Sequence, residues 1–364
     1  MVDYYILSNR NNKFSPSQGC LIEFEDVLVN CCNGVLIAPK FVPTSSRLKR
    51  CFEQFINPNQ IDIRPKKHNT NKHVLILVCL TIWDCSILQY IPYWRKKFDI
   101  VCAYVFDAFL PDSGKPEKFL SSSFRSLIGD LDYLFIPVTG SLEAFREKFN
   151  VPVEMIPLAC DVMKFGSYQT DRCIDIIGYG RQLTKHSKIL AKTYNSPNCK
   201  RIYYYTNHMK ISKIHNFYGH RKLFWKLLHN SYIALAYDVL TTPSNKFSFS
   251  FVGQRWFECL AAGCLVVGRR PVCPEANQLL NWEDATIEIP DDKDSVIPFI
   301  ESLLTDEQRL QSAHYRNYIN TLVHHDWRYR IADMLKCLNI DQPTPLRHDL
   351  NKLRQQYETF KLCL

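Results

Sequence analysis

The sequence lacks an apolar run long enough to cross a membrane. Its longest one, residues 74–83, is about half of the ~20 residues that a helical span needs, and it predicts a buried strand instead. The start of the chain also lacks the basic and apolar stretches of a signal peptide. We therefore expect a cytoplasmic protein, with peripheral membrane contact left open.

Metal-binding and redox cysteine motifs are missing as well. The chain has 15 cysteines, yet no pair has the C-x-x-C spacing of zinc ribbons and thioredoxin-like sites. The odd number of cysteines and the lack of a secretory signal favour reduced thiols. We expect no metal site and no cofactor, so the chemistry should be metal-independent.

Acidic residues do not balance the basic ones, and the net charge is +9. Such a charge suits an anionic partner, which could be a nucleic acid, a membrane surface or a nucleotide diphosphate. A solvated basic surface explains it equally well. Because the basic residues are scattered and no known binding motif is present, we expect no nucleic-acid partner.

The chain is too long, at 364 residues, for one ordinary domain, and its 46% apolar residues can fill two cores. Short strands are predicted first at residues 4–7, 21–24 and 27–29, with a short helix at 47–55. A regular series follows, with strands at 73–80, 100–106, 133–137 and 153–156 and helices at 85–97, 116–128 and 141–149. Strands that alternate with helices in this way predict a parallel sheet.

A second series of the same kind begins after residue 172. Its predicted strands are 174–177, 201–205, 232–237, 264–267 and 286–289, and its predicted helices are 181–194, 221–230, 255–262, 294–304, 306–338 and 346–362. The fold class is therefore α/β, with two Rossmann-like, doubly wound domains that face a central cleft. We predict a first domain at residues 1–162, a second at 163–340, and a helical tail at 341–364 that could pack back on the first.

Residues 253–263 form the most informative segment. Gly253 and Gln254 precede a helix that begins near Arg255, and a helix start offers unpaired N–H groups to a phosphate. Arg255 adds a positive charge there. Glu258 lies one turn further on, where a carboxylate can accept ribose hydroxyls. The alternative is an ordinary amphipathic helix on which Glu258 is merely solvated.

A second candidate for phosphate binding follows the strand at 174–177. Gly180 lets a ligand approach the backbone, and Arg181 and Lys185 lie about one helical turn apart, as a diphosphate clamp requires. A plain turn between strand and helix is the alternative. Further along, Tyr205 and Asn207 could stack on and hydrogen-bond to a nucleotide base.

The segment 253–263 resembles the donor-binding motif of GT-B glycosyltransferases, in particular family 4 and the CgeB-like proteins. The matching residues are Arg255, Phe257, Glu258, Leu260, Ala261 and Gly263. The resemblance implies that Glu258 binds the donor ribose and that Arg181 and Lys185 contact the donor phosphates. The family pattern has a second Glu at the position of Ser250, so the transferred sugar and the stereochemistry stay open.

The resemblance extends more weakly over residues 73–335. It includes the stretch 151–161 between the two series and the segment 324–328, which we expect to lie within a helix and to be structural. In the first domain, Asp84 and Asp107 each follow a predicted strand, where an acceptor would bind. Either could serve as a catalytic base, or only cap a helix or form a turn.

Taken together, the motifs predict a hexosyltransferase-like glycosyltransferase. It would move a sugar from a UDP- or GDP-linked donor to a hydroxyl of a glycan, a lipid-linked molecule, a protein or a small molecule. A nucleotide-sugar epimerase and a non-catalytic nucleotide-binding protein of the same fold are the alternatives.

Overall fold

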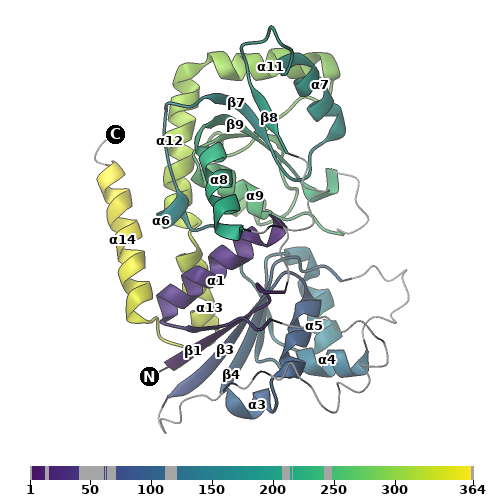
Figure 1. Cartoon of the computed structure of the whole chain (residues 1–364), viewed down its shortest axis with the longest axis vertical. Helices are drawn as coiled ribbons and strands as arrows, with labels where there is room; N and C mark the ends of the chain where they lie inside the picture. The colour runs from purple at the N-terminus through teal and green to yellow at the C-terminus, as the bar shows by residue number, and fades with distance from the viewer. Residues whose placement is uncertain are drawn as a thin grey trace.

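The computed structural model describes residues 2–12, 16–40, 61, 63, 71–110, 121–206, 214, 216–241 and 248–361. Two parallel β-sheets lie one above the other, each flanked by helices, and one helix from the start of the chain runs between them (Figure 1). This arrangement confirms the predicted α/β class with two Rossmann-like units. The predicted helix at 47–55 and the first part of the one at 116–128 lie outside the described residues.

The first sheet has six strands in the order β2-β1-β3-β4-β5-β6. They are β1 (Val2–Ser8), β2 (Val35–Ile37), β3 (Lys72–Cys79), β4 (Ile100–Val105), β5 (Tyr133–Ile136) and β6 (Val153–Met155). Neighbouring strands are all parallel, and Ile6 of β1 stands beside Ile76 of β3. Both strands are apolar and almost wholly buried because helices cover both faces of the sheet.

The described helical segments of this half differ from the predicted ones. They are η1 (Pro16–Gln18), α1 (Gly19–Cys32), η2 (Ile82–Tyr90), α3 (Trp94–Lys97), α4 (Ser122–Gly129), η4 (Thr139–Ser141) and α5 (Leu142–Phe149). The single helix predicted at 85–97 is instead a 3-10 segment and a four-residue turn. Pro92 lies between them, and a proline cannot donate the backbone hydrogen bond that would join them.

The strands predicted at 21–24 and 27–29 are wrong, because both segments belong to the single helix α1. This helix is buried on nearly every side, including Glu23 and Glu25, so it lacks the one-sided apolar stripe that identifies a surface helix. Its dense apolar residues resemble short buried strands at the level of sequence. Its position between the two sheets explains the pattern (Figure 1).

The second sheet has five strands in the order β11-β10-β9-β7-β8, and every neighbouring pair is parallel. They are β7 (Ile174–Gly178), β8 (Tyr203–Tyr205), β9 (Ser231–Tyr237), β10 (Leu265–Arg269) and β11 (Ile287–Glu288). Its helices are α6 (Val162–Phe165), α7 (Thr184–Tyr194), α8 (Phe217–His229), η6 (Val239–Thr241), α9 (Gln254–Ala261), α10 (Ala276–Leu279), α11 (Lys293–Thr305) and α12 (Glu307–His324). The predicted series of strands and helices is thus present, with shifted ends.

Two final helices, α13 (Trp327–Cys337) and α14 (Thr344–Lys361), return to the first half of the molecule. The Trp327 ring lies 4.4 Å from that of Phe24 on α1 and 5.6 Å from that of Phe106, which follows β4. Arg328 binds Asp161 at 2.8 Å and Asp349 of α14 at 2.9 Å. The end of the chain therefore helps to hold the two halves together, whereas the exact domain boundaries stay predictions.

The segment 324–328 is not within one helix, contrary to the prediction. His324 ends α12, and Asp326 caps α13 by accepting a hydrogen bond from the Arg328 backbone. His325, between them, binds the Leu279 carbonyl through Nε2 and contacts Arg330 through Nδ1. His325 is therefore buried and joins α13 to the end of α10, which agrees with the structural role expected for it.

Candidate functional site

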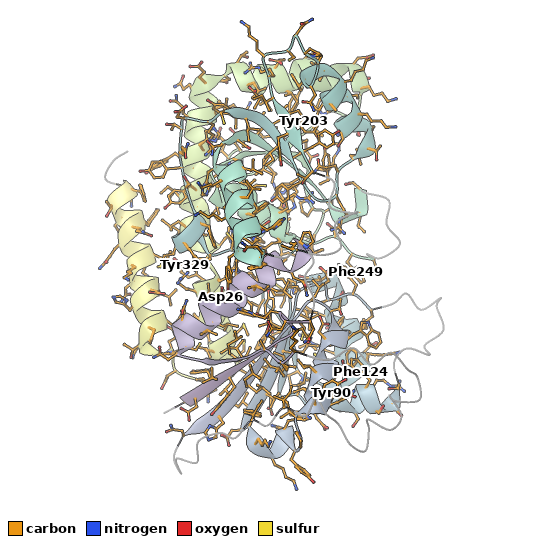
Figure 2. All side chains as sticks on the ribbon, viewed as in Figure 1. Asp26, Tyr90, Phe124, Tyr203, Phe249 and Tyr329 are labelled. Carbon is orange, nitrogen blue, oxygen red and sulfur yellow. The ribbon has the colours of Figure 1, made fainter. Side chains whose placement is uncertain are left out.

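The carboxyl ends of the two sheets meet. The ring of Phe109, which follows β4, lies 5.5 Å from that of Phe251, in the segment that precedes α9. A Cβ added to Gly140, which follows β5, would lie 2.4 Å from the ring of Phe249, so these two segments are in direct contact. Figure 2 places Phe249 between the upper and lower halves of the molecule.

The order of the second sheet changes direction between β7 and β9. From β7 the chain moves outward to β8 and then returns to the other side of β7 as β9. In open α/β sheets, ligands bind at such a switch point, outside the carboxyl ends of the strands. The residues that follow β7 and β9 there are Gly180, Arg181 and Asp238, and two of these three were predicted as site residues.

Gly180 and Arg255 fit closely against each other. Gly180 has φ +64, and a Cβ at this position would lie 2.4 Å from Arg255 Nη2, so both conformation and space favour glycine. The Arg255 guanidinium lies 5.1 Å from the centre of the Tyr179 ring and donates from Nη1 to the Arg181 carbonyl at 2.7 Å. Two predicted phosphate-binding segments, 74 residues apart in sequence, are thus brought together.

Arg181 lies in a field of several charges. Burial lowers its pKa most, and the neighbouring Arg255 charge lowers it further, whereas Asp107 of the first half and Asp238 of the second raise it. A half-buried guanidinium group whose charged form a second arginine disfavours is a favourable place for an anion. Asp107, of the first half, is one of the carboxylates whose charge acts on Arg181.

The start of α9 carries polar atoms that have no hydrogen-bond partner in the part of the chain that the structure describes. Gly253 is the N-cap residue and offers no side-chain cap. Gln254 donates to the Ala159 carbonyl at 2.7 Å, whereas its Oε1 and the Nε of Arg255 are buried and unpaired among the described residues. A buried polar atom without a partner costs roughly 1–3 kcal/mol, so a ligand that satisfies these atoms would be stabilised here.

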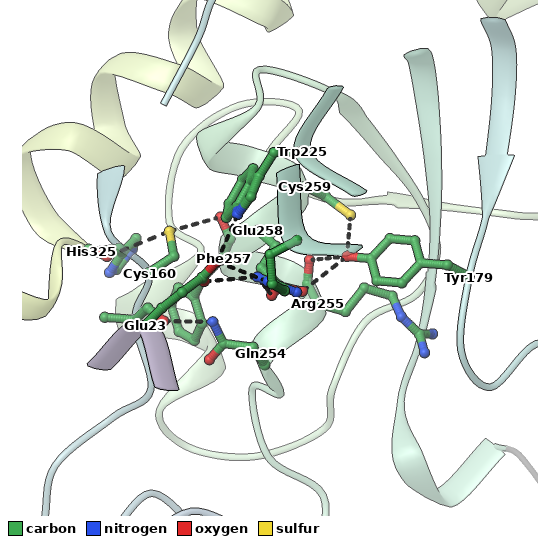
Figure 3. A network of polar contacts seen from close by, with 12 residues as sticks. Glu23, Cys160, Tyr179, Trp225, Gln254, Arg255, Phe257, Glu258, Cys259 and His325 are labelled. Atoms are coloured by element: carbon green, nitrogen blue, oxygen red, sulfur yellow. Dashed lines mark hydrogen bonds and ion pairs between the residues drawn. The ribbon is translucent and has the colours of Figure 1, made fainter. Parts of the chain in front are cut away.

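Glu258 does not point into open solvent. It is 4% exposed, and its Oε1 lies 2.7 Å from Arg221 Nη2 of α8. Its Oε2 accepts a hydrogen bond of 3.3 Å from the Tyr179 hydroxyl (Figure 3). Burial raises the pKa of Glu258 and Arg221 lowers it, with a net increase. Ribose hydroxyls could reach this carboxylate only if the surrounding side chains move.

Arg221 joins Glu258 to the first half of the chain. Its Nε and Nη2 donate to the two carboxylate oxygens of Glu23 on α1, each at 2.8 Å, and Trp225 Nε1 donates to Glu23 at 3.0 Å. Burial alone would lower the Arg221 pKa, but the two carboxylates raise it overall. We call Glu23, Arg221 and Glu258 the buried charge triad.

The other predicted donor-binding residues do not all lie at the switch point of the second sheet. Lys185 is half-exposed and pairs with Asp291 at 3.0 Å. Tyr205 is 49% exposed at the end of β8, with its ring stacked 5.2 Å from that of Tyr203. Ser250 is buried and donates to Asp238 at 2.9 Å. Asn207 lies outside the described residues.

The two aspartates proposed as a base differ in their surroundings. Asp84 is buried and accepts hydrogen bonds from the backbone of Leu80 at 2.9 Å and of Thr81 at 3.1 Å, in a capping box at the start of η2. These contacts correspond to the capping role that was the alternative for Asp84. Asp107 is half-buried after β4, close enough to Arg181 for its charge to change the pKa of that residue.

The first sheet has its own switch point, between β1 and β3. A small cavity there, with room for about one water molecule (about 10 Å³), is lined by Asn9, Arg10, Gln18, Leu21, Ile22, Glu25, Val78, Leu80 and Asp84. Arg10 is held by Glu25 at 2.6 Å and Asp26 at 2.8 Å. Burial raises the pKa of Glu25 to about 7. This cavity is too small for a sugar acceptor.

Sequence reasoning missed Glu23, Arg221, Asp238 and Glu275. All are charged residues in apolar surroundings and all are at least nine-tenths buried. A charged residue inside an apolar run is a signal that could have indicated a buried pair, but its partner could not be read from the sequence.

Within the described residues, no group of three or more His, Cys, Asp or Glu side chains could hold a metal ion, and the described cysteines are free. No helix in the described ranges is long and apolar enough to span a membrane. Metal independence and a cytoplasmic location stay predictions.

The fold and the meeting of the two carboxyl edges define the class of protein. Two parallel α/β sheets in tandem, with polar and charged residues where their edges meet, are the GT-B arrangement of glycosyltransferases. This confirms the resemblance at the level of the GT-B fold.

Comparison with known proteins agrees with that class. Residues 185–336, less than half of the chain, match the family model described as "Glycosyl transferase-like". No curated protein matches the sequence. The matched range contains the second sheet from α7 onward and the whole segment 253–263. The family match and the fold together support a glycosyltransferase enzyme, and the narrower likeness to family 4 and the CgeB-like proteins stays a prediction.

Several solved structures share the fold. A structure described as trehalose-6-phosphate from E. coli bound with UDP-2-fluoro glucose is 11% identical, with a TM-score of 0.55 over 94% of this chain and 100% of that one. The α,α-trehalose-phosphate synthase (UDP-forming) from Burkholderia vietnamiensis is 10% identical, with a TM-score of 0.54 over 95% and 99%. The match to the pneumococcal O-GlcNAc transferase GtfA, 14% identical, has a TM-score of 0.42, too low to show a shared fold, and it covers 75% of this chain but only 58% of GtfA.

Proposed function

We propose that the protein transfers a sugar from a nucleotide diphosphate sugar, UDP- or GDP-linked, to a hydroxyl acceptor. The donor diphosphate would lie at the switch point of the second sheet, against Gly180, Arg181, Arg255 and the start of α9. The acceptor would approach from the carboxyl edge of the first sheet, on the side of Asp107.

The observation that carries this proposal is the juxtaposition of Arg181 and Arg255 beside a helix start. Arg255 reaches the Arg181 carbonyl at 2.7 Å, its Nε has no partner among the described residues, and burial and next the Arg255 charge lower the Arg181 pKa. A diphosphate bound here would offset this repulsion between the two arginines. Backbone N–H groups at the start of α9 would add hydrogen bonds to the same anion.

The GT-B fold and the glycosyl transferase-like family match support this choice of ligand over a dinucleotide or a nucleic acid. The E. coli structure with this fold is bound with UDP-2-fluoro glucose. Nothing in the described residues favours an epimerase, and the experiment below distinguishes the two reactions.

The test is nucleotide binding followed by nucleotide release. Thermal melting is measured with UDP, GDP, UDP-glucose and GDP-mannose. At a ligand concentration about 100 times Kd, a one-site ligand stabilises by roughly 2.7 kcal/mol, which raises Tm by several degrees. Arg255→Met should weaken the best nucleotide at least about tenfold, because it removes a charge-assisted contact. Arg95→Met, an exposed arginine of the first half, is the matched control.

Activity is then measured with the best donor as release of the nucleoside diphosphate, with water or added sugars as the acceptor. A transferase releases nucleoside diphosphate, whereas an epimerase converts the donor without releasing it. A non-catalytic protein would bind and do neither. If none of the four nucleotides raises Tm, the proposal is wrong.

A further inference from the structure

Ser250 lies in the segment that precedes α9. The structure gives this serine a definite partner, because its Oγ donates to Asp238 Oδ2 at 2.9 Å. Asp238 directly follows β9, and its backbone N–H binds the Arg269 carbonyl at the end of β10 at 2.8 Å. The carboxylate therefore stands at the carboxyl edge of the sheet, across the switch point from Arg181.

Among the residues that the structure describes, the hydrogen-bonding capacity of Asp238 is only partly used. An ionised carboxylate has about four acceptor positions. Ser250 occupies one, and the Leu240 backbone N–H, at 3.4 Å from Oδ1, occupies another. Asp238 is 4% exposed. A buried carboxylate with vacant acceptor positions is stabilised by any hydroxyl that reaches it.

A second carboxylate lies on the next loop of the same edge. Glu275 ends the connection from β10 to α10 and is 4% exposed, yet neither of its oxygens has a hydrogen-bond partner among the described residues. The Cys273 thiol beside it is only a weak donor. Asp238 and Glu275 lie near the ends of neighbouring strands, because Asp238 binds the Arg269 carbonyl that ends β10 and Glu275 lies in the connection that leaves β10. Burial, and next the charge of Glu275, raise the pKa of Cys273 to about 12, and the charge of Asp238 adds to this increase.

We propose that Asp238 and Glu275 bind the hydroxyls of the transferred sugar and select a neutral, hydroxylated sugar over a uronic acid. This inference rests on the proposed function. The diphosphate at Arg181 and Arg255 would lead the sugar toward the loops after β9 and β10. Sugar hydroxyls would satisfy both carboxylates, whereas the carboxylate of a uronic acid would add a third negative charge to them.

The sugar preference of the protein is the quantity to measure. Dissociation constants are determined calorimetrically for UDP, UDP-glucose and UDP-glucuronate, and for GDP and GDP-mannose if the guanine nucleotide binds better. We expect the neutral sugar nucleotide to bind at least about tenfold more tightly than the uronate, because like charges brought together in a buried site oppose binding.

Asp238→Asn and Glu275→Gln preserve the size of each side chain while removing its charge. Each should reduce the preference for the neutral sugar over the uronate about tenfold, with binding of the nucleoside diphosphate unchanged. Ser250→Ala should weaken the neutral sugar nucleotide by a smaller factor, about threefold, because it only orients Asp238. Asp171→Asn, an exposed aspartate near the opposite edge of the sheet, is the matched control.

The outcomes separate this inference from the proposed function. If no nucleoside diphosphate binds the wild type, the proposed function fails. If nucleotides bind but both amide variants keep the wild-type preference, the sugar assignment is wrong and nucleotide binding stands. If Asp238→Asn fails to fold, Glu275→Gln and Ser250→Ala still decide, because an unchanged preference in both overturns the assignment.

Discussion

The substitution Arg221→Met would test the buried charge triad directly. Methionine fills a similar volume but leaves Glu23 and Glu258 without the cation that both bind, at 2.8 and 2.7 Å. All three side chains are at most 7% exposed, so water cannot replace the lost contacts. The triad joins α1 of the first half to α8 and α9 of the second, and its loss should loosen the contact between the halves.

The size of the effect follows from that burial. Removing one partner of a buried ion pair costs about 3–5 kcal/mol, because the charge left behind stays desolvated. Here two carboxylates are left behind, and the remaining donors are Trp225 Nε1 for Glu23 and the Tyr179 hydroxyl for Glu258. We therefore expect a loss of about 3–5 kcal/mol of unfolding free energy at pH 8.

The loss should shrink as the pH falls. Without Arg221, the pKa of Glu258 in the folded variant rises further above its unfolded value near 4.5, because burial remains and the neighbouring cation is lost. The folded variant then takes up protons before the unfolded chain does, so its relative stability increases from pH 8 toward pH 5. In the wild type, burial has already raised the Glu258 pKa even with Arg221 present.

Urea unfolding followed by tryptophan fluorescence and circular dichroism, at pH 8, 6.5 and 5, is the assay. Arg95→Met is the control, because Arg95 pairs with Asp132 while 43% exposed and should cost less than about 1 kcal/mol at every pH. The double variant Glu23→Gln with Glu258→Gln, added to Arg221→Met, should recover part of the loss. A loss below about 1 kcal/mol for Arg221→Met, or one that does not change with pH, would refute this reasoning.

Two further predictions concern stability. His314 donates from Nδ1 to the Gly263 carbonyl, its Nε2 is buried without a partner among the described residues, and burial lowers its pKa to about 3. An unfolded histidine takes up a proton near pH 6.5, whereas His314 in the folded protein stays neutral. The wild type should therefore lose about 2–3 kcal/mol of unfolding free energy relative to His314→Gln between pH 6.5 and 4.5. A difference in urea unfolding that stays constant with pH would contradict this. The raised pKa of Glu25 changes stability with pH in the opposite direction, but Glu25 is present in both proteins, so its contribution cancels when they are compared at the same pH. Gly268→Ala should lower the unfolding free energy by about 3 kcal/mol or more, because its Cβ would lie 1.7 Å from the Ala236 carbonyl oxygen on the neighbouring strand. The unfolding free energy of proteins typically falls by about 1–3 kcal/mol per M urea. An unfolding midpoint within about 0.2 M urea of the wild type would therefore contradict this packing.

The sequence by itself determined the architecture. Alternating strands and helices depend on hydrophobic periodicity and chain breaks, which act over a few residues, and most predicted strands lie within a few residues of the observed ones. The helix predicted at 255–262 is α9, residues 254–261. Gly180 also follows its strand as expected, in the left-handed conformation that favours glycine.

Tertiary structure decided what the predicted side chains contact. Whether residues 21–29 form strands or a helix depended on their burial between the two sheets, because a helix buried on every side has no apolar stripe. The partners of Glu258 are 37 and 79 residues away, and its link to Glu23 passes through Arg221. The hydrogen-bond partner of Ser250 is Asp238, which lies 12 residues earlier in the sequence. Local preferences act over a few residues, whereas these charges are brought together only when the sheets and helices pack, and that packing determines which carboxylates are paired with a cation.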